Sequence, residues 1–203
     1  MSSDELILRD FSSGDLPGAG EIALRLWGSE ADFIPASMLR DLYEYLVRFY
    51  YIPDSPLSCA VTSSGELCAF MLAATEKHSS CHADEWILKR ISSPEEKKVF
   101  EIYKAYLEAN QKAEEKELRS HEAMVLLLAS IRPGCGKLLM EELNRRCLKQ
   151  DIRSILLWTD DTCNVQWYER NHFAEVSHFA ATPSLPGQNL NTYLYRKELI
   201  PIE

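Results

Sequence analysis

The sequence predicts a mixed α/β fold, with a largely antiparallel central sheet flanked by helices and with a helical insertion. Three observations support this prediction. Apolar runs of strand length alternate with segments of helical periodicity along the 203 residues. Two of these runs, 57–62 and 66–74, are joined by Ser63, Ser64 and Gly65, which is the chemistry of a hairpin turn. Later runs are joined by helices, and a sheet with both kinds of connection has mixed strand directions.

The first part of the chain predicts a short strand and two helices before the hairpin. Residues 5–9 form the strand. Asp15 and Pro17 provide the cap and the first turn of a helix, and apolar residues then recur at helical spacing. Residues 36–51 predict a second helix, which the prolines at 53 and 56 end.

Residues 77–120 are rich in charge and poor in β-branched residues, so we expect them to be a helical insertion. Ser93, Pro94 and Glu96 make a capping box with proline in the first helical position, and the helix that follows is expected to run to about Glu117. The sequence favours a helix that covers one face of the sheet, and a lid or acceptor-binding segment is the alternative. Residues 1–203 are then one domain that contains this insertion.

The rest of the chain alternates between strands and helices. Residues 123–130 are almost wholly apolar, which predicts a strand buried on both faces. The elements after it, in alternation and ending with two closing strands, are expected at 137–149, 154–158, 164–171, 173–180 and 192–197.

Composition restricts the classes of function. The chain has 31 Asp and Glu against 22 Lys and Arg, a formal net charge of −9, so nucleic acid is not an expected partner. No apolar run approaches the ~18 residues of a membrane helix. The N-terminus lacks the basic and apolar regions of a signal peptide. The six cysteines have no CxxC spacing, which indicates free thiols. We therefore expect a cytoplasmic protein without a membrane partner, and the oligomeric state stays open, with a homodimer as one form.

A metal site is not expected. His78, Cys81 and His82 are close in sequence, but their spacing fits no standard zinc pattern.

A glycine turn follows the apolar strand at 123–130 directly. Gly-x-Gly at 134–136 opens a helix, and such a turn leaves backbone N–H groups unobstructed where the helix dipole favours an anion. A P-loop is excluded, because Ile131 stands where its first glycine belongs and Leu138 where its hydroxyl belongs. A dinucleotide fingerprint would need a third glycine where Leu139 stands. A plain strand-to-helix turn is the alternative.

Two motifs in this order resemble the Gcn5-related N-acetyltransferase family. They are Arg132-Pro-Gly-Cys-Gly-Lys-Leu-Leu between an apolar strand and a helix, and Asn164-x-x-Trp-Tyr-Glu-Arg after the next apolar strand. The resemblance covers the strand order over most of the chain and is specific over 122–173. It implies an enzyme that moves an acetyl group from acetyl-CoA, as co-substrate, to a primary amine of a small molecule or peptide by direct attack.

The resemblance also implies roles for single residues. The pantetheine arm of acetyl-CoA would pair with the strand near Leu128 and Ser130, and Asn164 would contact the cofactor. Tyr168 matches the tyrosine near the thioester sulfur that serves as general acid. The pyrophosphate would lie on the backbone N–H groups around Arg132, Gly134, Cys135, Gly136 and Lys137.

The chemistry of acyl transfer explains why such residues are needed. An attacking amine must lose a proton, and a thiolate leaves more easily when it is protonated. Glu122, at the start of the apolar strand, is the predicted general base, directly or through water; a solvated carboxylate at a strand end is its alternative. For Tyr168 the alternative is an aromatic core residue. Asp160 and Asp161 are weaker candidates for acceptor binding.

Several positions depart from the family pattern. Ile131 stands where Arg or Gln is usual, with Arg132 one residue late, and Pro133 removes an amide donor from the turn. His172 replaces the common glycine before Phe173. These departures keep a second function open, a non-catalytic module of the same fold that binds CoA or acyl-CoA. Transfer to a protein N-terminus or lysine is a further alternative for the acceptor.

Overall fold

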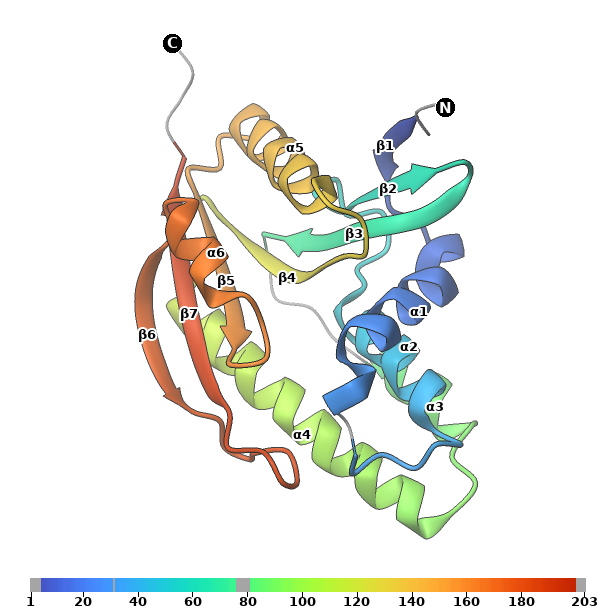
Figure 1. Cartoon of the computed structure of the whole chain (residues 1–203). Coiled ribbons are helices and arrows are strands. Elements are labelled where there is room, and N and C mark those ends of the chain that lie inside the picture. Colours follow the sequence, from blue (N-terminus) through green and yellow to red (C-terminus); the bar gives the residue numbers. More distant parts are fainter. Residues whose placement is uncertain (1–4, 31, 76–80, 200–203) are drawn as a thin grey trace.

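The computed structural model describes residues 5–30, 32–75 and 81–199, and within them seven strands form one sheet (Figure 1). The order is β1-β2-β3-β4-β5-β7-β6. β4 and β5 are parallel, and the other neighbouring pairs are antiparallel. The predicted mixed, largely antiparallel sheet is therefore confirmed. The strands are β1 (Leu6–Asp10), β2 (Cys59–Ser63), β3 (Glu66–Ala74), β4 (Glu122–Ser130), β5 (Ser154–Asp160), β6 (Ala174–Ala180) and β7 (Asn191–Glu198).

The helices lie close to their predicted places. One helix, α3, was not expected as a separate element, and two short 3-10 turns flank α1. No helix of the described residues is long and apolar enough to cross a membrane. The helices are α1 (Leu16–Trp27), α2 (Leu39–Tyr50), α3 (Cys81–Leu88), α4 (Pro94–Glu117), α5 (Cys135–Lys149) and α6 (Val165–Arg170), with 3-10 turns at Ser13–Asp15 and Gly28–Glu30.

The predicted cap of α4 is present. Ser93 Oγ accepts a hydrogen bond from the Glu96 N–H at 3.1 Å. The Glu96 carboxylate in turn accepts from the N–H of Ser92 at 2.7 Å, one residue earlier than in a regular capping box. Ser37 Oγ, in the loop before α2, donates to the same carboxylate at 2.7 Å and so ties that loop to α4.

The sheet separates two buried clusters, as β4 shows. Met124 and Leu126 pack with residues of α1, α2 and α4, whereas Ala123 and Val125 pack with residues of α5. This alternation is the two-residue period of a strand. In Figure 1, α5 lies above β3 and β4, and α4 lies below β4 and β5.

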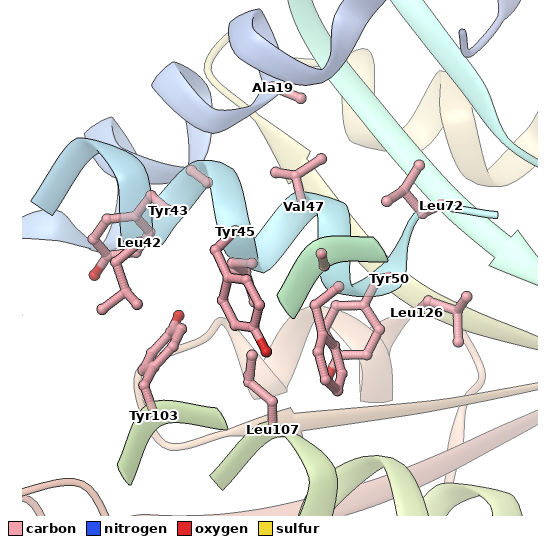
Figure 2. Close-up of a cluster of buried hydrophobic side chains, with 14 of the residues drawn as sticks. Ala19, Leu42, Tyr43, Tyr45, Val47, Tyr50, Leu72, Tyr103, Leu107 and Leu126 are labelled. Carbon is pink, nitrogen blue, oxygen red and sulfur yellow. The ribbon is translucent and has the colours of Figure 1, made fainter. Parts of the chain in front are cut away.

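The first cluster is aromatic where α2 meets α4. Figure 2 shows Tyr43, Tyr45 and Tyr50 of α2 facing Tyr103 and Leu107 of α4, and all five side chains are buried. This packing holds α4 against α2, so α4 is part of the core.

β4 and β5 pair over four residues and then separate. Glu122–Val125 pairs with Ser154–Leu157, after which β4 continues beside β3 and β5 continues beside β7. The prediction that this strand is buried on both faces holds as far as Leu126. Leu127 and Leu128 are half-buried, because the neighbouring strand has left them.

Candidate functional site

A cavity of about 130 Å³ opens where β4 and β5 separate. The strand segments Val125–Leu128 and Leu157–Asp160 form one part of its wall, and Tyr168 of α6 lies beside them. Side chains of α1, α2, α4 and the loop before β7 close the other sides. The gap between β4 and β5 is thus lined by residues from both the N-terminal and the C-terminal part of the chain.

The glycine turn precedes α5 on the same strand. Gly134 caps the helix with φ 85° and ψ −23°, a left-handed conformation that glycine adopts without strain. Gly136 and Lys137 lie in the first helical turn, whose N–H groups have no acceptor within the helix. A Cβ on Gly136 would meet no heavy atom within 4 Å. The turn therefore offers open N–H groups and a helix dipole to an anion.

Hydrogen bonds hold the strand end before this turn. The Ile131 N–H donates to the Cys68 carbonyl at 3.1 Å, which prolongs the pairing of β3 with β4. Ser130 Oγ donates to the Arg132 carbonyl at 2.9 Å. The Arg132 guanidinium donates to Ser63 Oγ on β2. Arg132 thus places a positive charge beside the turn. The Ser130 hydroxyl is used in a hydrogen bond within the turn.

Cys135 contributes only its backbone to this surface. Its side chain is fully buried, with Sγ 4.0 Å from Cys68 Sγ. Burial, together with Cys135, raises the pKa of the Cys68 thiol to about 11. The Cys135 N–H already donates to the Arg132 carbonyl at 3.3 Å. Among the predicted N–H groups of the turn, this one is partly engaged.

Tyr168 lines the cavity from α6. Its ring stacks on Tyr195, with centroids 6.0 Å apart, and meets the edge of Phe173 at 5.6 Å. No side-chain hydrogen bond engages its hydroxyl in the described part of the chain. Burial, followed by the nearby Cys163 and Asp160, raises the pKa of Tyr168. The phenol is therefore protonated at neutral pH and can donate a proton.

The two adjacent aspartates after β5 have different surroundings. Asp160 lines the cavity and is only 8% exposed. Its Oδ2 accepts from the Tyr106 hydroxyl at 2.7 Å, and its Oδ1 accepts from the Thr162 N–H at 3.0 Å and Oγ1 at 2.6 Å. Asp161 is exposed, lies outside the cavity lining and accepts from the Tyr193 hydroxyl at 2.8 Å. Only Asp160 can meet a molecule in the cavity.

Glu122 lies at the paired end of β4, outside the cavity lining. Its Oε1 accepts from Arg196 Nε at 2.7 Å and from Ser154 Oγ at 2.8 Å, and its Oε2 accepts from the Arg119 N–H at 2.9 Å. The Arg196 guanidinium already compensates the Glu122 charge in a buried ion pair outside the cavity. This geometry argues against the predicted role of Glu122 as general base.

The other predicted positions lie around the cavity in different ways. Leu128 lines it directly. Asn164 is exposed at the start of α6, in a second, more open hollow that shares Cys163 with the cavity. His172 has φ 67°, a left-handed angle that explains why glycine is common there in the family that the sequence resembles. His78 and the side chain of Cys81 lie outside the described residues.

The structure adds an aromatic wall that sequence reasoning did not assign to the site. Trp27, Phe33 and Tyr43 line the cavity from the N-terminal helices and the loop between them, and Tyr103 and Tyr106 line it from α4. Tyr103 and Tyr106 are three positions apart in the sequence, a spacing that predicts a stripe on one face of a helix. Nothing in the local pattern indicates that such a stripe faces a cavity.

Comparisons with known proteins agree with this fold. No protein-family model and no curated protein matches the sequence. Among solved structures, the ribosomal-protein-S18-alanine N-acetyltransferase from Escherichia coli is 13% identical with a TM-score of 0.54, over 98% of this chain and 97% of that one. The PaiA N-acetyltransferase from Thermoplasma acidophilum, solved in complex with coenzyme A, is 16% identical with a TM-score of 0.54, over 96% and 99%.

A further structure that matches is the C-terminal condensation domain of Ebony in complex with beta-alanyl-dopamine. It is 10% identical with a TM-score of 0.67, over 96% of this chain and 99% of that one. The strand order, the separation of β4 from β5 and these matches agree, and the chain has the fold of the Gcn5-related N-acetyltransferases.

Proposed function

We propose that this protein is a Gcn5-related N-acetyltransferase that transfers an acetyl group from acetyl-CoA to a primary amine. The observation that carries the proposal is the separation of β4 from β5, with an open glycine turn at the end of β4 and the Tyr168 side chain in the gap. Coenzyme A bound to a protein of this fold, PaiA, supports the choice of donor.

The residues present fit such a donor. The N–H groups of Gly136 and Lys137 would hold the pyrophosphate, with Arg132 as a nearby positive charge. The edge of β4 that β5 leaves unpaired, around Leu128, would hold the pantetheine arm through backbone hydrogen bonds. When bound, acetyl-CoA supplies a thioester whose acetyl group passes to the amine.

Asp160 would act as the general base and Tyr168 as the general acid. The amine nitrogen forms a bond to the acetyl carbon as the carbon–sulfur bond breaks. Asp160, the carboxylate of the cavity, takes a proton from the nitrogen, and Tyr168 gives its proton to the departing sulfur. A backbone N–H on the open edge of β4 would stabilise the charge that develops on the carbonyl oxygen.

A non-catalytic module that binds CoA or acyl-CoA is the second candidate. The partly engaged Cys135 N–H and the missing donor at Pro133 favour it, because they reduce the number of N–H groups at the turn. It needs the glycine turn and the open edge of β4, but it does not need Tyr168 or Asp160. The alternative acceptor, a protein N-terminus or lysine, uses the same chemistry.

One structural neighbour bears on the acceptor. Beta-alanyl-dopamine, which is bound to the Ebony domain, is by its name an amide of an aromatic amine. A protein of this fold therefore accommodates such an amide, which supports an amine as the acceptor here.

Thermal melting with CoA and an assay of CoA release test the proposal. A ligand at one hundred times its Kd stabilises a protein by roughly 2.7 kcal/mol, so millimolar CoA should raise the melting temperature visibly. Acetyl-CoA with amines should then release CoA faster than acetyl-CoA alone. A melting shift without release for any class of amine supports the binding module, and folded protein without a shift removes both candidates.

A further inference from the structure

We propose that the acceptor is a small aromatic amine without a carboxylate, an arylalkylamine, with its ring among the aromatic side chains of the cavity and its ammonium group at Asp160. The transfer step rests on the proposed function. The binding of the amine does not, because it depends only on the shape and charge of the cavity.

The aromatic wall gives the first reason. Tyr43, Tyr103 and Tyr106 line the cavity and are 5%, 6% and 3% exposed, and Trp27 and Phe33 complete the wall. The Tyr43 hydroxyl donates to the Trp27 carbonyl at 2.8 Å, which fixes that ring. Figure 2 shows Tyr43 and Tyr103 on facing helices. Rings held in this way favour edge or offset contacts with another ring.

The size of the cavity gives the second reason. Its volume is about 130 Å³. An apolar protein cavity of about 150 Å³ takes up benzene, so this space suits one six-membered ring.

The distribution of charge gives the third reason. Among the described residues that line the cavity, Asp160 alone has a charged side chain. One ammonium group finds a partner there. A carboxylate on the acceptor would find no basic group in this lining, and a second ammonium group would stay unpaired, and burying either charge without a partner is costly. Aromatic amino acids and polyamines are therefore disfavoured.

A hydrogen bond joins the aromatic wall of this pocket to its charged residue, Asp160. Tyr106 belongs to the aromatic wall, and its hydroxyl donates to the Asp160 carboxylate. A ring among the aromatic side chains and a two-carbon arm would thus bring the nitrogen toward Asp160 and Tyr168. During transfer the ammonium nitrogen loses two protons. One replaces the proton that the thiol takes from Tyr168, and the other leaves through Asp160 to solvent.

Calorimetric titration of the wild-type protein tests the inference without any transfer reaction. The probes are 2-phenylethylamine, phenylalanine, hexylamine and spermidine, each with and without CoA. We expect 2-phenylethylamine to bind about tenfold or more tightly than the other three, because they lack the ring or carry an unpaired charge. Equal affinities, tighter binding of spermidine or phenylalanine, or no saturable binding of 2-phenylethylamine in either state would overturn the inference.

Two variants with matched controls locate the site. Asp160→Asn should weaken 2-phenylethylamine binding about tenfold or more, whereas Asp161→Asn, next in sequence but outside the cavity lining, should not. Ile34→Trp should fill the cavity and abolish amine binding, and Ile7→Trp, at an exposed position on β1, is its control. If Asp160→Asn does not fold, the Ile34→Trp pair decides the inference alone.

The CoA melting shift separates the two proposals. Asp160→Asn should keep that shift, because its side chain belongs neither to the glycine turn nor to the open edge of β4. If the amine binds but CoA does not raise the melting temperature, the acetyltransferase proposal is wrong and the amine-binding pocket stands. If CoA raises the melting temperature but the amine does not bind, the arylalkylamine proposal is wrong and the acetyltransferase proposal stands.

Discussion

The Tyr106 hydroxyl donates a 2.7 Å hydrogen bond to Oδ2 of Asp160 and so connects α4 to the end of β5. Both residues are buried, and 54 positions separate them in the sequence. Burial raises the pKa of Tyr106, and the Asp160 charge raises it further, so the hydroxyl is a permanent donor. This bond fixes the carboxylate that the proposed acceptor would meet.

Tyr106→Phe should destabilise the fold, because it removes a buried hydrogen bond to a charged group. We expect the free energy of unfolding to fall by about 1.5–3 kcal/mol. Tyr193→Phe removes a similar bond to the exposed Asp161 and should cost less than about 1 kcal/mol. Urea denaturation measures both values. Equal losses would mean that the Tyr106–Asp160 bond gains nothing from its burial.

Gly136→Val should abolish CoA binding and leave the fold intact. The new side chain would occupy open space over the first turn of α5, where we place the pyrophosphate. Gly134→Ala is the matched change: it should destabilise the fold by about 1–2 kcal/mol, because φ is 85° at that residue. Melting curves with and without CoA report both effects. Normal CoA affinity in folded Gly136→Val protein would put the phosphate site elsewhere.

Tyr168→Phe should reduce kcat and kcat/KM together by ~10²-fold or more, the usual contribution of a general acid. CoA affinity should change little, because only a hydroxyl is lost. Since burial raises the pKa of Tyr168, the wild-type rate should not fall between about pH 7 and 9 through its ionisation. Steady-state kinetics checks both statements.

Tyr195→Phe is the control for that change. Its ring stacks on Tyr168, and its hydroxyl donates to Glu169 outside the cavity lining. We expect nearly normal rates from this variant. Full activity of Tyr168→Phe would assign the proton transfer to another group.

Glu114→Gln should stabilise the protein at alkaline pH. Glu114 is fully buried on α4, and neither carboxyl oxygen has a hydrogen-bond partner among the described residues. Burial first, and then the Glu115 and Glu122 charges, raise its pKa well above the ordinary value of 4.5. Above pH 4.5 the Glu114 carboxyl has lost its proton in the unfolded chain but keeps it in the native protein. The free energy of unfolding therefore falls as pH rises.

Denaturation at pH 5 and pH 8 measures this effect. The advantage of Glu114→Gln over the wild type should be larger at pH 8. Glu101→Gln, at an exposed position on the same helix, should show no such difference. Parallel curves for all three proteins would show that the Glu114 carboxyl is not buried in solution.

Local features of the sequence predicted most of the elements. The cap at Ser93 and Glu96, the hairpin at 63–65 and the glycine turn at 134–136 depend on neighbouring residues, so spacing and residue type are enough to find them. The order of strands and helices followed from the same periodicities. α3 was missed as a separate helix, because its eight residues show no clear period.

The site depended on contacts between distant residues. Glu122 is at the start of a strand, as predicted, but its partner Arg196 lies 74 positions later and engages the carboxylate in an ion pair. Asp160 and Asp161 have the same side chain in adjacent positions, and only the path of β5 away from β4 gives one of them the cavity. Sequence alone therefore determined most of the elements, the glycine turn and the family resemblance, because these are properties of neighbouring residues. Tertiary structure decided which carboxylate faces the cavity and which rings enclose it, because strand register and helix packing bring those groups together from across the chain.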